Sequence, residues 1–512
     1  MSLPLSARTS LRMRSTVAAG LGLAAVSALA GAVRLGAVGL WRDEAFSARL
    51  ASLPPGTFLR FVAGVEPNGL LYHLVLFGWV RLGQGEAFLR IPSVLFAAGS
   101  VVLTYLLGKR LLGRPAGILG ALLLACNPIF LAYSQEVRSY ALMVLVATAG
   151  SLIFTAAVLD DDRRAWRWYP VVAALSMYAH YFAALTIAAQ FISLLLLGRR
   201  RVEWSRVVRS GAVLAVLVSP LLLFGLSNRP DSLSGVLPTT PGRLLTFTLG
   251  LVGGKELTVV LLGLVATSIG FWLRGAGTVA EGRQRWTMGF LVTSLVVPLA
   301  TGLVVSLFKP LMVPRYFLAV LPPLMLLAAA GALHLHRRLL RGRAAPGMVV
   351  LLLLPLLGFS VSQHYLTATK PDSRGAVGHV TSHAQPGDAI AFPTFWGIPA
   401  FQWYGVRIHP QVAELLDFVF PRPQRRALLG DDLWRDGDFL VRSTAQSFDP
   451  QPARAAIGEH RRLWTIEDGG GDERSRFEEQ ILLDMIGGKR LCEERHFRDV
   501  HVRLYAVTCP QG

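Results

Sequence analysis

Residues 141–158 read ALMVLVATAGSLIFTAAV, an 18-residue run without a charged side chain. A helix needs about 20 mostly apolar residues to cross the hydrocarbon core of a bilayer. Nine further apolar runs lie at 16–40, 91–108, 116–134, 169–198, 210–226, 246–273, 287–307, 315–336 and 347–365. This pattern predicts a polytopic α-helical membrane protein.

The run 169–198 is too long for a single span. Its centre, Tyr178-Ala179-His180-Tyr181, is polar and aromatic and would suit the bend between two short, tilted helices. Counting this run twice predicts about eleven transmembrane helices. The sequence Gly253-Gly254-Lys255-Glu256 interrupts 246–273 and makes that span the least regular of the set.

The composition supports the same class. Hydrophobic residues make up 53% of the 512 residues and charged residues 16%, whereas soluble proteins average roughly a quarter charged. These values exclude a disordered chain, a collagen-like fibre and a small disulfide scaffold. The net charge of +19 sits in short clusters between apolar runs, which is typical of membrane topology and not of a nucleic-acid-binding face.

The basic clusters predict the orientation of the chain. Cytoplasmic loops are enriched in Lys and Arg, and Arg8, Arg12 and Arg14 precede the first span. With a cytoplasmic N-terminus, strict alternation places every dense cluster on the cytoplasmic side, at 109–114, 163–167, 199–209, 274–285 and 337–343. We expect a multi-pass protein of a bacterial plasma (inner) membrane, since the strong preference for arginine over lysine is typical of GC-rich bacterial genomes.

The N-terminus also fits a second interpretation. Residues 1–31 have the basic start, apolar stretch and Ala28-Leu29-Ala30 sequence of a cleavable signal peptide. We favour an uncleaved first helix, because the apolar run continues to Leu40. In either case residue 41 emerges on the exoplasmic face.

Two long segments lie between or after the spans. Residues 41–90 form an exoplasmic first loop, in which Gly69–Leu82 is too short to span and predicts an interfacial helix. Residues 366–512 are more polar, and alternation in His501–Cys509 and Asp438–Arg442 predicts strands. We therefore divide the chain into a transmembrane domain, 1–365, and a small C-terminal exoplasmic α/β domain, 366–512.

The three cysteines are too few and too scattered for a structural zinc site. Cys126 lies inside an apolar run, whereas Cys492 and Cys509 lie near the C-terminus. The last two could form a disulfide if their domain is outside the cytoplasm.

An acidic pair follows the first span in Trp41-Arg42-Asp43-Glu44-Ala45. Such acids can simply stabilise a helix N-terminus. A functional interpretation is a general base or a metal ligand at the mouth of a membrane cavity.

Other polar groups are predicted on the same face, and each has a structural alternative. Glu136 and Arg138, in AYSQEVRSYAL, could lie in a short loop among headgroups, and Arg315 could snorkel from a helix end. Aromatic residues often form an interfacial belt, but they can also stack on a sugar. The candidates for substrate binding are Glu136, Arg138, His180, Tyr181, Lys309, Arg315, Tyr316 and His73.

The order of these motifs resembles a known class of enzymes. A basic N-terminus, a first span, Asp-Glu, a long loop, AYSQEVRSYAL and later PRYFLAVLPP look like the polyprenyl-phosphate-sugar glycosyltransferases of the GT-C class. The branch is family 39-like, related to the protein O-mannosyltransferases and the lipid A aminoarabinose transferase. EPNGLLYHLVLFGWVRLGQGEAFLRIPSVLF and KPDSRGAVGHV are also similar to its members.

The resemblance implies roles for individual residues. Asp43, with Glu44 beside it, matches the catalytic carboxylate, and Glu136 matches a second-loop acid that organises the site or a divalent cation. Arg138 and Arg315 become candidates for the donor phosphate. Because the class has metal-dependent and metal-independent members, a Mg or Mn ion at Asp43 and Glu136 stays open. Many relatives carry a His-Pro-Pro-type stretch where this chain has Glu66-Pro67-Asn68, which leaves the acceptor open.

The predicted function is an inverting transfer of a sugar from a polyprenyl monophosphate to a cell-envelope glycan, lipid or protein on the exoplasmic face. The main alternative is a flippase or transporter of lipid-linked sugars. Transporters place ionisable groups near the bilayer midplane, but here they cluster on one side. A third alternative is a polymer-assembly protein whose function is carried by 366–512. No nucleic-acid partner is expected.

Overall fold

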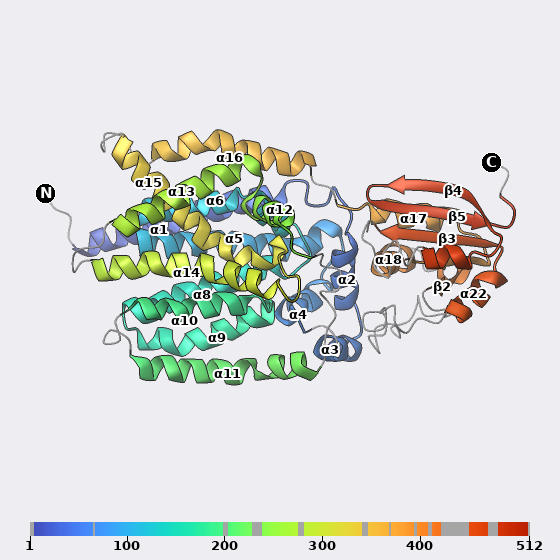
Figure 1. Cartoon of the computed structure of the whole chain (residues 1–512), viewed down its shortest axis with the longest axis horizontal. Helices are drawn as coiled ribbons and strands as arrows, with labels where there is room; N and C mark the ends of the chain where they lie inside the picture. Colours follow the sequence, from blue (N-terminus) through green and yellow to red (C-terminus); the bar gives the residue numbers. More distant parts are fainter. Residues whose placement is uncertain are drawn as a thin grey trace.

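The computed structural model describes residues 5–509, apart from 65–66, 198–202, 228–237, 275–280, 340–346, 368–369, 394–396, 408–411, 421–449 and 469–479. The chain forms a long helical bundle followed by a smaller sheet-containing part at one end of it (Figure 1). Helix α1 (Leu5–Ala32) begins at the opposite end of the bundle, and the helices α2 (Arg42–Ala51), α3 (Pro55–Gly64) and α4 (Leu70–Trp79) lie beside the sheet-containing part.

A helix occupies each of the predicted apolar runs. The helices of the bundle are α1 (Leu5–Ala32), α5 (Glu86–Leu112), α6 (Arg114–Ala125), α7 (Pro128–Ser134), α8 (Tyr140–Leu159), α9 (Arg163–Ala179), α10 (Ala183–Ser193), η1 (Leu194–Leu196), α11 (Trp204–Ser227), α12 (Pro241–Val252), α13 (Lys255–Arg274), α14 (Glu281–Val305), η3 (Pro314–Val320), α15 (Leu321–Leu339) and α16 (Gly347–Thr367).

Seven helices of the described residues are long and apolar enough to cross a membrane, and the bent pair α6–α7 would make an eighth. The predicted total of eleven would also require α9, α10 and α16 to cross, so that number stays a prediction. The break between α9 and α10 falls at His180, as expected from the polar centre of that run. The run 246–273 is divided at Gly253 and Gly254 into α12 and α13.

Hydrogen bonds tie several basic clusters together at one end of the bundle. Lys109 donates to Thr16, and Arg110 and Arg206 pair with Asp160 and Asp161, respectively. These residues lie in α1, in the last turn of α5, between α8 and α9 and in the first turn of α11, so segments that are far apart in sequence share one basic end. The shared end agrees with the alternation that the positive-inside rule predicts.

The first loop is more helical than predicted. In addition to the expected interfacial helix, observed as α4 (Leu70–Trp79), it contains α2 (Arg42–Ala51) and α3 (Pro55–Gly64). Phe58 and Phe61 of α3 are buried, and the Phe58 ring stacks on Phe77 of α4 at 4.3 Å between centroids. The apolar faces of these short helices therefore form a small core of their own at the end of the bundle.

The C-terminal part contains one five-stranded sheet of order β2-β1-β3-β5-β4. Strand β1 is parallel to β2 and β3, whereas β5 is antiparallel to β3 and β4. Its elements are α17 (Ser373–His383), β1 (Asp388–Ala391), α18 (Gly397–Phe401), η4 (Gln402–Val406), α19 (Val412–Leu415), β2 (Leu416–Phe420), α22 (Pro450–Glu459), β3 (Arg462–Asp468), β4 (Arg490–Phe497) and β5 (Val500–Ala506).

The strand predicted at His501–Cys509 corresponds to β5, and the one predicted at Asp438–Arg442 lies outside the described residues. Cys492 and Cys509 form a disulfide. The bond joins the start of β4 to the segment after β5.

Candidate active site

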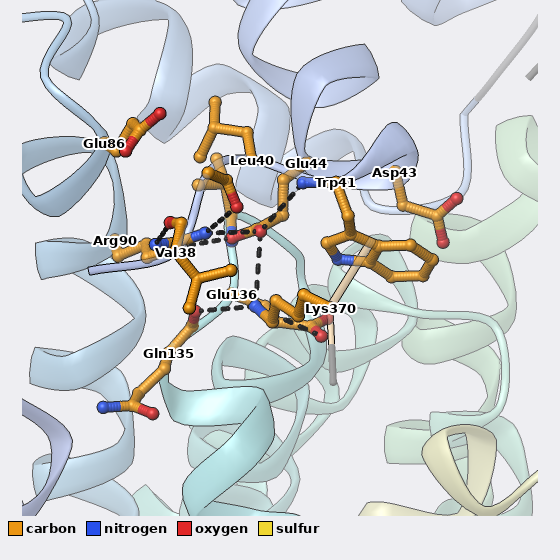
Figure 2. Close-up of polar contacts among 12 residues, drawn as sticks. Val38, Leu40, Trp41, Asp43, Glu44, Glu86, Arg90, Gln135, Glu136 and Lys370 are labelled. Carbon is orange, nitrogen blue, oxygen red and sulfur yellow. Dashed lines mark hydrogen bonds and ion pairs between the residues drawn. The ribbon is translucent and has the colours of Figure 1, made fainter. Parts of the chain in front are cut away.

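The adjacent acids Asp43 and Glu44 point in different directions. Both lie in the first turn of α2, where successive side chains are separated by about 100° around the helix axis. The Glu44 side chain is completely buried, whereas that of Asp43 is 15% exposed. Figure 2 shows Asp43 pointing away from the contacts of Glu44. Asp43 and Glu44 are adjacent in the sequence, but the helix geometry therefore places them in two different environments.

Glu44 forms a buried ion pair with Arg90 of α5. The Arg90 guanidinium donates to both carboxylate oxygens, from Nε to Oε1 at 2.8 Å and from Nη2 to Oε2 at 2.7 Å. Arg90 also donates to the carbonyl oxygens of Leu35, Val38 and Gly39. The chain between α1 and α2 is thus folded around one buried arginine, which fixes the position where α2 begins.

A second cation reaches the same carboxylate from the C-terminal side of the bundle. Lys370 Nζ donates to Glu44 Oε2 at 3.2 Å and to the carbonyl oxygen of Gln135 at 3.2 Å. It also lies 3.6 Å from Oε1 of Glu136 (Figure 2). Lys370 therefore connects the acid of the first loop with the acid of the second.

The two glutamates respond differently to burial. Desolvation would raise the pKa of Glu44, but Lys370 and Arg90 outweigh it and lower this pKa to about 2. Desolvation dominates for Glu136 and raises its pKa to about 7, with Lys370 acting in the opposite sense and the Glu44 and Asp43 charges adding to the increase. Glu44 is therefore a fixed anion, whereas Glu136 can exchange a proton near neutral pH.

The Asp43 carboxylate lies in a second environment, which contains arginines and a tyrosine. Arg315 of η3 interacts electrostatically with Asp43 and hydrogen-bonds Tyr133. Arg138 donates to the Ser47 hydroxyl at 3.2 Å, one helical turn after Asp43. Arg315 thus interacts with the Asp43 carboxylate, which also lies 3.8 Å from Arg42 Nε, and Arg138 reaches α2 one turn further along.

The aromatic candidates form a continuous group next to these arginines. The His180 ring lies 5.5 Å from Tyr140 and 5.8 Å from Tyr316 between centroids. The backbone N–H of Tyr181 donates to Asn68 at 3.2 Å, which connects this group to the first loop. His73 of α4 is buried, and burial together with the Arg138 charge lowers its pKa to about 3. His73 is therefore neutral at physiological pH.

Comparisons with known proteins point to one fold. The family model described as dolichyl-phosphate-mannose-protein mannosyltransferase matches residues 67–224, and no curated protein matches the chain. Among solved structures, ArnT from Cupriavidus metallidurans bound to undecaprenyl phosphate is similar with a TM-score of 0.59 and 12% identity, covering 96% of this chain and 99% of that one.

Two further glycosyltransferases are similar in structure. The oligosaccharyltransferase of Archaeoglobus fulgidus in its apo form has a TM-score of 0.51 and 12% identity, covering 96% of this chain and 74% of that one. The arabinofuranosyltransferase AftD from Mycobacteria has a TM-score of 0.50 and 17% identity, covering 97% of this chain but 40% of that one.

This chain has the GT-C glycosyltransferase fold. The resemblance that the sequence motifs predicted is confirmed, as is the class of a polytopic helical membrane protein with a small C-terminal sheet. The family match includes the second acidic loop and the α9–α10 break of the GT-C bundle. Asp43 and Glu44 precede the matched residues.

Two residues of the site were not predicted from the sequence. Arg90 is a charge at the start of an apolar run, and Lys370, one of five lysines, directly follows the last run. Both positions look like ordinary membrane-interface cations, so only their burial against Glu44 distinguishes them. Conversely, Lys309 is exposed just after α14, outside the contacts described above.

Within the described residues, one group of side chains could hold a metal ion, with its donor atoms within 4.8 Å of one another: Glu494, His496 and His501 of the C-terminal sheet. Glu494 there is already bonded to Arg503 at 2.7 Å. Asp43 and Glu136 lie outside that group. Glu136 nevertheless has a buried carboxylate oxygen, Oε2, without a hydrogen-bond partner, and a divalent cation would satisfy it.

Proposed function

We propose that this protein transfers a sugar from a polyprenyl-monophosphate carrier to a hydroxyl of a cell-envelope acceptor, with Asp43 as the general base. The observation that carries the proposal is the division of the acidic pair. Glu44 is held by Arg90 and Lys370, whereas Asp43 keeps partial exposure beside Arg315. A base must be reachable by its substrate, and Asp43 meets that condition.

The arginines near Asp43 support a phosphate-linked donor. Arginine binds phosphate oxygens in a bidentate manner, and Arg315 and Arg138 come from two elements that meet at this point. The similar fold of ArnT holds undecaprenyl phosphate, which agrees with a polyprenyl carrier. Tyr316 and His180 would contact the sugar, and Tyr181, His73 and Lys309 stay weaker candidates for substrate binding.

The proposed reaction is a single displacement. Asp43 removes the proton of the acceptor hydroxyl as its oxygen attacks the anomeric carbon. The bond from that carbon to the phosphate oxygen breaks at the same time, and the carrier phosphate leaves with the electron pair. One displacement inverts the configuration, and the nearby carboxylates stabilise the positive charge that develops on the sugar.

The unpaired carboxylate oxygen of Glu136 supports a second proposal, a divalent cation at the site. Asp43 and Glu136 would hold it, and a cation there would supply charge compensation for the donor phosphate, a common arrangement for Mg²⁺. The protein's own contribution is unchanged in that case, since Arg315 orients the phosphate and Asp43 receives the proton.

The proposed location is a bacterial plasma membrane with the C-terminal domain on the exoplasmic side. The disulfide between Cys492 and Cys509 supports this orientation, because disulfides persist outside the reducing cytoplasm. The acceptor would then be an envelope glycan, lipid or protein that is reached from outside.

Asp43→Asn tests the proposal. The variant keeps the size of the side chain but cannot accept the proton, and a general base contributes typically 10²–10⁴-fold. We expect kcat to fall at least about 100-fold in the purified full chain, measured as transfer from a panel of radiolabelled polyprenyl-phosphate pentoses and hexoses to an envelope extract.

Asp160→Asn, at the opposite basic end of the bundle, is the matched control and should keep its activity. Near-normal transfer by Asp43→Asn would remove Asp43 from the reaction. Movement of labelled lipid across vesicles without transfer to any acceptor would instead support the flippase.

A further inference from the structure

We propose that Lys370 is a positioning residue through which the C-terminal domain holds the two acidic loops of the active site together. The inference rests on the proposed function, because it assigns the catalytic role to the loop that Lys370 supports. Lys370 begins the segment KPDSRGAVGHV and lies just before α17, whose residues Ala376, Val377 and Val380 are buried in the core.

Lys370 contacts partners that lie very far away in the sequence. Glu44 is 326 residues and Gln135 is 235 residues from it, and both contacts measure 3.2 Å. Its side chain is 22% exposed, so the ammonium group is largely enclosed by its partners. No local secondary structure requires this arrangement, which depends on the segment after α16 returning to the base of the first loop.

The charges explain why a cation is required there. Glu44 and Glu136 lie close enough that each raises the cost of ionising the other. Arg90 reaches Glu44, and Lys370 is the cation positioned between the two carboxylates. Without Lys370 the two acidic loops would repel each other across a buried space, and the bonds from Val137 to Glu44 and from Arg138 to Ser47 would have to hold α2 to the second loop against that repulsion.

The C-terminal domain also contacts both ends of the first loop. Arg374 pairs with Glu86 at 2.9 Å, at the point where the loop enters α5. The Tyr404 hydroxyl donates to Glu86 at 2.5 Å and accepts from the backbone N–H of Leu40, just before α2. The C-terminal domain therefore contacts the loop before, within and after the helix that carries Asp43.

These contacts make a prediction about turnover. Asp43 is the neighbour of Glu44 in α2, so a shift of Glu44 moves the proposed base relative to the bound donor. Displacement of a reacting group by about 1 Å can cost roughly 100-fold in rate. Loss of Lys370 should thus lower kcat with little change in the KM for the donor, since the described contacts of Lys370 are with Glu44, Gln135 and Glu136 and not with Arg315.

The test compares Lys370→Met and Lys370→Arg in the full chain, with transfer from the labelled polyprenyl-phosphate sugar that the unaltered protein uses. We expect Lys370→Met to lower kcat about 10- to 100-fold at similar KM and Lys370→Arg to recover much of that loss. Lys489→Met is the matched control, because Lys489 is in the same domain and contacts only the Ile457 carbonyl oxygen among its described partners.

Hydrogen exchange gives a readout that does not require activity. The Val137 amide donates to Glu44 at 3.0 Å, so Lys370→Met should speed exchange at Val137 and in α2 but not in α17. If Lys370→Met does not fold, Arg374→Met tests the contact of the C-terminal domain with the first loop through Glu86. In that variant kcat should fall a few-fold at constant KM. Unchanged exchange at Val137, or full kcat in the folded variant, would overturn the proposal.

An unaltered protein that transfers no sugar would refute the proposed function instead. The exchange result would still decide whether Lys370 joins the loops.

Discussion

Asp43 and Glu44 are neighbours in the chain, yet their surroundings are opposite in kind. Glu44 has both carboxylate oxygens bonded to cations and no exposed surface, and Asp43 is partly open. Such a division follows from the helix geometry, because only one of two successive residues can face the core. At the scale of single residues, substitution of Glu44 should therefore lower stability, whereas substitution of Asp43 should lower activity.

Glu44→Gln should reduce stability strongly. The change leaves the Arg90 guanidinium buried without its counter-charge, and removing one partner of a buried ion pair costs about 3–5 kcal/mol. We expect a clearly lower Tm in detergent, measured by thermal unfolding, whereas Asp43→Asn should unfold close to the unaltered protein. Equal Tm values for the two variants would contradict the division of roles.

The difference in stability between Glu136→Gln and the original protein should depend on pH in a defined direction. The pKa of Glu136 rises from 4.5 to about 7 on folding, so its contribution is present below pH 4.5 and is lost as pH rises through 7. The neutral glutamine avoids that loss. Glu136→Gln should therefore match the original protein near pH 5 and be more stable at pH 8, by about 3 kcal/mol at most.

The measurement is thermal unfolding at both pH values. Glu44 behaves oppositely: its pKa falls to about 2, so its contribution is present above pH 4.5 and is lost only as pH falls through 2. A stability difference between Glu136→Gln and the original protein that is larger at pH 5 than at pH 8 would contradict the assignment.

Among the elements, the division of 246–273 into α12 and α13 depends on backbone conformation. Gly253 ends α12 with φ +111°, a left-handed conformation that other residues rarely adopt. A Cβ at this position would also lie 2.6 Å from Pro128 of α7. The side-chain amide of Asn127 donates to the Val252 carbonyl oxygen at 2.7 Å, and this hydrogen bond joins the end of α12 to the start of α7.

Gly253→Ala should consequently destabilise the protein. The left-handed conformation alone costs about 1–2 kcal/mol for a residue with a Cβ, and the contact with Pro128 adds to it. Gly270→Ala, inside α13 with open space around it, is the matched control and should be neutral or slightly stabilising. Thermal unfolding of the two variants checks this difference, and equal stability would contradict it.

In the whole molecule, the site lies where the first loop, the second loop and the C-terminal domain meet. The start of α1 and the contacts of Lys109 and Arg110 at the end of α5 lie at the far end of the bundle from the sheet (Figure 1). A basic end and a disulfide-bonded end are the two signatures of a membrane protein with one face in the cytoplasm and the other outside.

Labelling of single cysteines would test this orientation. In intact cells, an impermeant maleimide should label Asp499→Cys, in the turn between β4 and β5, but not Arg164→Cys near the start of α9. Both should react after lysis, which serves as the control for exposure. Labelling of Arg164→Cys in intact cells would reverse the proposed topology.

The sequence was sufficient for the class of fold because the bilayer imposes a simple length and polarity requirement on each helix. Ten apolar runs, the broken run at His180, the surface helix α4 and the strand β5 could be located without coordinates. The acidic pair and the arginine at 315 could also be singled out, since charges beside apolar runs are costly unless they serve a purpose.

Only the tertiary structure showed that Asp43 and Glu44 have different surroundings, and only it brought in Arg90 and Lys370. Their contacts join segments that are 46 and 326 residues apart. Hydrophobic periodicity indicates which face of a segment is buried, but it contains no information about which charged side chains form ion pairs with one another. That pairing depends on the packing of the loops and the C-terminal domain around one another, because a carboxylate can be buried only where the fold supplies its counter-charges.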